Sequence, residues 1–119
     1  MKMTDRDEPR KSVSLKVGEI IALKKAIMYL KFSCADAGAD IFAASPLING
    51  AFESLISADD LGEMEVKFYQ KGSKENERYV LSRIDEIEAR DGKEMSEELK
   101  RRIYEAWVYP FRLTSDFDK

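Results

Sequence analysis

The spacing of hydrophobic residues predicts a long helix near the start of the chain. Between residues 13 and 37, apolar side chains recur every three or four positions, the period of a helix face, and a second apolar stripe runs beside the first. Ser14 is a candidate N-cap and Gly38 suits the position after a helix end, so we expect a helix from about Lys16 to Ala37. The two stripes are, first, Val13, Val17, Ile20, Leu23, Ile27, Leu30, Cys34 and Ala37 and, second, Ile21, Met28, Phe32 and Ala35.

Two apolar faces on one helix have two interpretations. A helix of this kind is typically central in a domain, where neighbouring elements cover both faces. Alternatively, one stripe is the seam of a homodimer that forms through the helix around residues 16–37. Exposure of one stripe in the monomer would favour the second interpretation, because a large apolar patch calls for a partner.

The Ser45-Pro46 pair predicts the start of a second helix. Serine is a favoured N-cap, and proline is favoured at the first helical position. The apolar residues that follow share one face, so we expect a helix from Pro46 to about Ser57, although Asn49-Gly50 is also a hairpin signal. The residues on the shared face are Ile48, Phe52, Leu55 and Ile56.

The segment around residues 63–70 is compatible with two structures. Met64, Val66 and Phe68 alternate as in a strand, which favours a hairpin of residues 64–70 with residues 78–84. Because Glu, Met, Lys and Gln are good helix formers, we prefer a short helix that ends before Gly72.

Two serines predict the starts of the last two helices. Ser73 precedes a helix over residues 74–90, and Ser96 precedes a helix that runs to Tyr109. Pro110 ends the latter, because the residue before a proline avoids the α conformation. The expected inward residues are Val80, Ile84 and Ile87 in the first of these helices and Leu99, Ile103, Ala106 and Trp107 in the second, and an apolar tail of Phe111, Leu113 and Phe117 is expected to fold back.

Together these elements predict an all-α fold, a compact bundle of four to five helices formed by residues 13–119 as a single domain. Residues 1–12 are polar and contain Pro9, so we expect a disordered N-terminal arm. Charged residues make up 36% of the chain, which favours solvated amphipathic helices over a buried sheet. The alternative is an α+β fold with one β-hairpin around residues 64–84.

Residue counts exclude several classes of function. With no histidine and one cysteine, Cys34, the chain has no internal disulfide, no Cys/His zinc site and no histidine-based catalysis. Its glycines are scattered singly and form no phosphate-binding loop. We therefore assign no catalytic residue, no metal and no cofactor, and we expect a protein that is not an enzyme.

The sequence also bears on location. The first twelve residues lack the apolar core of a signal peptide. The longest uncharged stretch, Ile41–Phe52, is shorter than the roughly 20 apolar residues of a membrane span. A lone cysteine suits a reducing compartment, so we expect a cytoplasmic protein without a membrane partner.

Charge is unevenly distributed, and this distribution predicts the partner. Residues 32–65 contain seven acids and no basic residue, which favours a basic protein partner and disfavours nucleic acid. We predict a non-enzymatic protein-binding module, such as an inhibitor, an immunity or antidote protein, or an adaptor. A module that pairs an acidic surface with a basic target resembles the antidotes of basic nucleases. The candidate binding residues are the acids Asp36, Asp40, Asp59, Asp60 and Glu63 and the aromatic anchors Tyr104 and Tyr109.

Two other functions are compatible with the sequence. Asp60-x-x-Glu63 and Asp85-x-x-Glu88-x-x-Asp91 place carboxylates on one helix face. This spacing resembles the ExxE and ExxD pairs with which all-α nucleotide pyrophosphohydrolases hold Mg²⁺, although the same spacing is common on a solvated face. The first alternative is therefore a small Mg²⁺-dependent hydrolase of that kind. The second is a structural dimer or assembly subunit built on the first helix.

Overall fold

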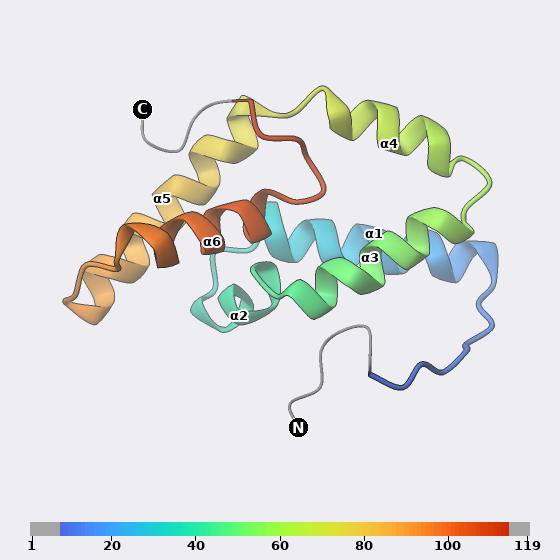
Figure 1. Cartoon of the computed structure of the whole chain (residues 1–119), viewed down its shortest axis with the longest axis horizontal. Helices are drawn as coiled ribbons and strands as arrows, with labels where there is room; N and C mark the ends of the chain where they lie inside the picture. Colours follow the sequence, from blue (N-terminus) through green and yellow to red (C-terminus); the bar gives the residue numbers. More distant parts are fainter. Residues whose placement is uncertain (1–7, 115–119) are drawn as a thin grey trace.

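The computed structural model describes residues 8–114, and this part of the chain contains six α-helices, one 3₁₀ turn and no strand (Figure 1). Helices hold 70% of it, so the predicted all-α bundle is confirmed. The hairpin alternative around residues 64–84 is wrong, because both of its segments are helical. The elements are α1 (Val17–Phe32), η1 (Ala37–Ala39), α2 (Asp40–Ala43), α3 (Pro46–Ala58), α4 (Gly62–Gln70), α5 (Lys74–Asp91) and α6 (Glu97–Val108).

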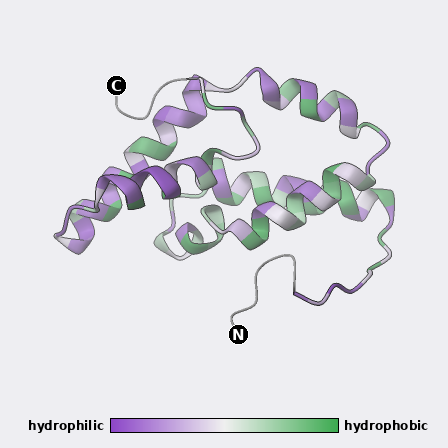
Figure 2. Ribbon diagram, in the orientation of Figure 1, coloured by the Kyte–Doolittle hydropathy of each residue, from purple (hydrophilic) through white to green (hydrophobic). Residues whose placement is uncertain are grey.

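The helices form one packed body, and one end of the α5–α6 pair projects from it (Figure 1). α1 and α3 pack side by side, α2 packs against α1, and α5 pairs with α6 (Figure 1). α4 packs against α3 and then leads into α5. Figure 2 shows apolar residues concentrated on α1 and α3, whereas the end of the α5–α6 pair that projects from the body is mostly hydrophilic.

Side-chain caps start three helices at the predicted positions. Ser45, Ser73 and Ser96 each accept a hydrogen bond from the backbone N–H three residues later, at 3.2 Å in every case. α3, α5 and α6 therefore begin directly after these serines. Residues 8–16 have no regular structure and are exposed; the remainder of the predicted arm, residues 1–7, lies outside the described residues.

α1 is shorter than the hydrophobic period predicts. It ends at Phe32 and not at Ala37, so Gly38 does not follow its end. Asp36 instead starts η1, because its carboxylate accepts a hydrogen bond from the Gly38 N–H at 2.7 Å. The apolar period beyond Phe32 thus belongs to a separate turn, which a local Asp cap stabilises.

The core lies mainly between α5, α6 and α2, around Trp107. Trp107 is 1% exposed, and Val80 and Ile84 are fully buried, as the sequence predicts. Leu99 is also predicted to point inward, but it is 43% exposed. It lies in the first turn of α6, where the α5–α6 pair projects beyond the other described helices (Figure 1).

Lys31 is a fully buried lysine that caps two helices. Its Nζ donates to the carbonyl oxygen of Ala43 at 2.8 Å and to that of Ala106 at 2.9 Å, in the last turns of α2 and α6. Helix C-termini carry partial negative charge, which favours a cation there. Burial opposes the charge and lowers the pKa of Lys31 to about 7. One side chain therefore ties α1 to both α2 and α6.

Within residues 8–114, no single helix combines the length and the apolar character that crossing a bilayer requires. The required length and apolar character are met only by two segments counted together, Ala37–Ala43 and Pro46–Ala58, which are bent by 61° relative to each other. This bent pair leaves apolar side chains on the surface, since Ile41 is 73% exposed and Leu47 is 69% exposed.

Candidate functional site

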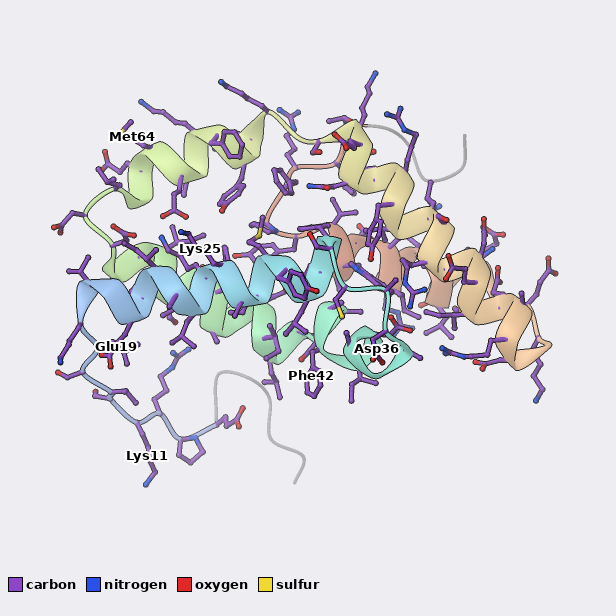
Figure 3. The ribbon with its side chains drawn as sticks, turned by 180° about the vertical axis from the view of Figure 1, so that it is seen from behind. Lys11, Glu19, Lys25, Asp36, Phe42 and Met64 are labelled. Atoms are coloured by element: carbon purple, nitrogen blue, oxygen red, sulfur yellow. The ribbon has the colours of Figure 1, made fainter. Side chains whose placement is uncertain are left out.

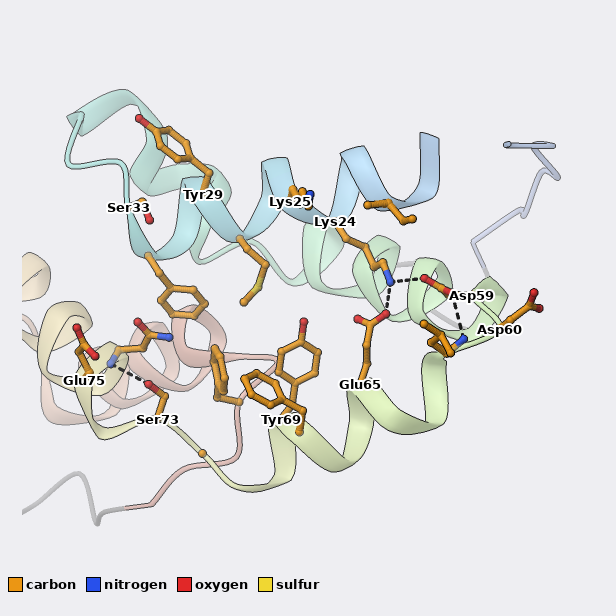
Figure 4. Close-up of a pocket in the computed structure, with 18 of the residues that line it drawn as sticks. Lys24, Lys25, Tyr29, Ser33, Asp59, Asp60, Glu65, Tyr69, Ser73 and Glu75 are labelled. Atoms are coloured by element: carbon orange, nitrogen blue, oxygen red, sulfur yellow. Dashed lines mark hydrogen bonds and ion pairs between the residues drawn. The ribbon is translucent and has the colours of Figure 1, made fainter. Parts of the chain in front are cut away.

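A groove of about 1230 Å³ lies between α1 and α4 (Figure 4). It exists because α4 packs against α3 and then leads away into α5, which leaves its inner side facing α1 across a gap (Figure 1). Pockets for small molecules usually span about 300–1,000 Å³. The groove is larger than this range and is open to solvent.

Apolar side chains line both walls of the groove. α1 contributes Ile21, Met28 and Phe32 from its second stripe, and the opposite wall contributes Leu61 and Phe68. Ile21 is 40% exposed and Phe68 is 57% exposed. The expectation that neighbouring helices cover both stripes of the first helix is therefore wrong for the second stripe, which faces the groove.

Phe111 joins the two walls through an aromatic cluster. Its ring centroid lies 5.5 Å from that of Phe32 on α1 and 6.1 Å from that of Phe68 on α4. The Tyr69 ring meets it edge-on at 5.1 Å. Edge-to-face pairs are worth ~0.5–1.5 kcal/mol each beyond burial, so the cluster holds the groove in shape. The predicted return of the tail is confirmed for Phe111, whereas Phe117 lies outside the described residues.

Lys24 spans the groove and pairs with two acids (Figure 4). Its Nζ lies 2.6 Å from Asp59 Oδ2 and also bonds Glu65 Oε1. Burial disfavours the ammonium, but hydrogen bonds to Asp59 and Glu65 outweigh this and raise the pKa of Lys24. Lys24 and the N–H of Leu61 in turn lower the pKa of Asp59. This ion pair ties α1 to the corner between α3 and α4.

The five acids predicted as binding residues do not lie together. Asp36 lies just before η1 and Asp40 is the first residue of α2, whereas Asp59, Asp60 and Glu63 lie at the corner between α3 and α4 (Figures 3 and 4). The 13 residues of α3 run between the two groups, a length of about 20 Å at the helical rise. The acidic stretch of the sequence is therefore not one acidic surface.

Three of these acids make contacts within the fold. Asp36 caps η1, Asp40 pairs with an arginine of α5 at 2.8 Å, and Asp59 pairs with the lysine that spans the groove. Asp60 and Glu63 are exposed and have no ion-pair partner within residues 8–114. A partner can reach these last two without breaking an internal ion pair.

The two tyrosines predicted as anchors have different environments. Tyr104 is 1% exposed, and its hydroxyl donates to Glu77 Oε1 at 3.0 Å, so it lies in the core and not at a surface. It is three residues before Trp107 and therefore shares the inward face of α6. Tyr109 is half-buried, with its ring 6.5 Å from that of Phe52. It lines a smaller hollow between α3, α4 and the segment after α6, not the groove.

The carboxylates of the hydrolase alternative are partly engaged in helix contacts. Glu88 accepts a hydrogen bond from the Met95 N–H at 2.8 Å and pairs with Lys100 at 3.1 Å, and these bonds lower its pKa. It thereby links α5 to α6. No group of three or more Asp, Glu, Cys or His side chains within residues 8–114 is placed to hold a metal ion.

The groove was not predicted from the sequence, although the apolar residues of one of its walls were recognised. The second stripe of the first helix supplies one wall, but nothing in the local sequence indicates that α4 would leave it uncovered. Comparison with protein-family models, with curated proteins and with solved structures found no match for this chain.

Proposed function

We propose that this chain is a protein-binding module, such as an inhibitor, an antidote or an adaptor, that holds a basic partner in the groove between α1 and α4. The partner's apolar side chains enter the groove, and its basic side chains meet the acids at the rim. The proposal needs no catalytic residue, cofactor or metal.

The open apolar groove is the observation that carries this proposal. Folded monomers rarely expose large contiguous apolar surfaces, and those that they do expose are often interaction sites. Phe68 keeps more than half of its surface exposed, and Tyr69 lies beside it on the same wall. Aromatic side chains in a partly enclosed site are frequent interface anchors.

The charges around the groove support a basic partner. Its lining contains four acidic residues, Asp59, Asp60, Glu65 and Glu75, and two lysines, Lys24 and Lys25. Lys24 pairs with two of the acids, which leaves two acids and one lysine at the rim. An excess of negative charge at the rim speeds association with a basic partner and disfavours an acidic one.

Selection from a random peptide library tests the function. We expect the immobilised chain to enrich peptides that combine apolar residues with Lys or Arg, and we expect Phe68→Asn to abolish their binding. Met64→Asn is the matched control, because Met64 lies on the same helix, is 69% exposed and does not line the groove (Figure 3). No enrichment, or equal binding by the wild type and Phe68→Asn, contradicts the proposal.

A structural dimer is the second candidate, because the first stripe is also incompletely covered. Val17 is 65% exposed and Leu23 is 44% exposed. Sedimentation equilibrium at micromolar protein separates the two functions. A mass near twice 13.7 kDa that returns to 13.7 kDa in Leu23→Asn supports the dimer, and a monomeric wild type contradicts it.

A further inference from the structure

Resting on the proposed function, we propose that the occupant of the groove is an amphipathic α-helix with basic side chains near both of its ends. Its apolar face lies between α1 and α4, and its polar face remains in solvent. The shape of the walls, their backbone chemistry and the positions of the rim acids all favour this occupant.

The α1 wall has the period of a helix face. On α1 the lining residues Ile21, Met28 and Phe32 are seven and four positions apart, so they form one line on one face. On the other side Leu61 and Phe68 are seven positions apart. From residue 21 to residue 32 the α1 wall is about 16 Å long at the helical rise. A helix with anchors at i, i+4, i+7 and i+11 presents a matching line over the same length.

Backbone chemistry favours a helix over an extended peptide. Both walls are helices whose N–H and C=O groups already bond within α1 and α4. An extended segment in the groove would bury its own backbone groups without partners, and an unpaired buried polar group is costly. A helix satisfies these groups internally and presents only side chains to the walls. The groove therefore suits a helix of the partner and not an added strand.

The rim acids place the partner's basic residues. Asp60, just before α4, and Glu75, in the first turn of α5, lie at opposite ends of the groove (Figure 4). Neither has an ion-pair partner within residues 8–114. Lysine or arginine near each end of the bound helix can meet one acid each. A second copy docked groove to groove would instead bring these acids together, because a two-fold interface pairs identical surfaces.

Three synthetic peptides test the inference. The first carries leucines at i, i+4, i+7 and i+11 with lysines at both ends; the second replaces the lysines with glutamates; the third reorders the first so that leucines and polar residues alternate. Each is titrated into ¹⁵N-labelled protein. We expect the first peptide to shift amides of α1, α4 and residues near Phe111, and the other two to bind at least about tenfold more weakly.

The rim acids have a matched control. Asp60→Asn with Glu75→Gln should weaken binding of the first peptide about three- to tenfold, the effect of two exposed ion pairs. Asp85→Asn with Glu105→Gln removes the same charge from exposed positions outside the groove lining and should leave binding unchanged. Equal effects of the two double variants overturn the placement of the basic residues.

These experiments can disprove the helical occupant without disproving the proposed function. If peptides selected from the library need Phe68 but bind equally well when reordered, the proposed function stands and the helical occupant is wrong. If shifts map away from α1 and α4, both proposals fail. The protein alone is also measured at rising concentration. If groove amides then shift without peptide and the mass doubles, the occupant is a second copy of the chain and the inference is overturned.

Discussion

Lys31 and Trp107 exchange hydrogen bonds in both directions across 76 residues of sequence. The indole Nε1 of Trp107 donates to the backbone carbonyl of Lys31 at 2.6 Å, and Lys31 Nζ donates to the backbone carbonyl of Trp107 at 3.3 Å. This exchange fixes the end of α1 against the end of α6. The Tyr109 ring, whose centroid is 6.0 Å from Nζ, is the titratable group that faces the ammonium from beyond α6.

The free energy of unfolding should rise with pH above neutrality because of Lys31. Its pKa is about 7 in the folded chain and about 10.5 when free, so the unfolded chain binds more protons in this window. Stability then increases by up to about 1.4 kcal/mol per pH unit. The gain should end near pH 10, where the raised pKa of Tyr104 begins to favour the unfolded state. Urea unfolding at several pH values measures this slope, and Lys31→Met should remove it. An equal slope in the variant would assign the effect to other groups.

Gly72→Ala should destabilise the chain more than Gly92→Ala. Both glycines adopt positive φ, 74° and 70°, so each alanine meets a left-handed backbone that costs about 1–2 kcal/mol. At Gly72 the added Cβ would also lie 2.1 Å from Thr114 Cγ2 and 2.8 Å from the Arg112 carbonyl oxygen, whereas at Gly92 nothing lies within 4 Å. We expect an extra cost of about 1–3 kcal/mol for Gly72→Ala in urea unfolding. Equal costs would show that the tail does not press on Gly72.

Tyr104→Phe should reduce stability and leave partner binding intact. The hydroxyl donates to Glu77, which is 3% exposed and also accepts hydrogen bonds from the N–H and hydroxyl of Thr114 at 2.8 and 2.7 Å. Loss of one donor to this buried carboxylate should cost about 1–2 kcal/mol. Tyr29→Phe, at a tyrosine that is 57% exposed, should change stability by less than about 0.5 kcal/mol. If Tyr104→Phe weakens the binding of library-selected peptides although the protein is still folded, Tyr104 is part of the interface and the prediction is wrong.

Lys24→Met should lower the melting temperature, because it leaves Asp59 and Glu65 close together without their shared cation. Lys25→Met is the matched control, since Lys25 also lines the groove but has no ion-pair partner within residues 8–114. The pKa of Asp59 is lowered in the folded chain. The advantage of wild type over Lys24→Met is therefore present above the free carboxyl pKa of about 4 and is lost as the pH falls below it. Identical melting of the two lysine variants would contradict a structural role for the ion pair.

Helix positions could be predicted from the sequence because their determinants are local. A serine cap decides where α3, α5 and α6 begin, and it acts within one turn of the chain. The groove could not be predicted in this way, since it depends on where α4 settles relative to α1 after the whole chain has packed. The burial of Tyr104 could not be predicted for the same reason, because the position of α5 decides which aromatic residue of α6 faces the core.

A periodic feature could have indicated the two buried lysines. Lys24 and Lys31 are seven residues apart and continue the spacing of Ile20 and Ile27, so they lie within the apolar face of α1 and not on its polar side. A lysine in such a position needs acceptors from another element. The sequence marks the need, but only the folded chain identifies the acceptors as two carboxylates for Lys24 and backbone carbonyls for Lys31.

The position of Phe111 has a consequence for the order in which the groove forms. Both helical walls are complete once synthesis has passed α4, but the ring that joins them lies beyond α6. A nascent chain that has reached only α5 therefore has the Lys24–Glu65 ion pair between α1 and α4 but lacks the aromatic ring that joins their ends. The aromatic end of the groove is complete only when the segment after α6 is in place, so we expect a partner that needs Phe111 to bind only after this segment has been made.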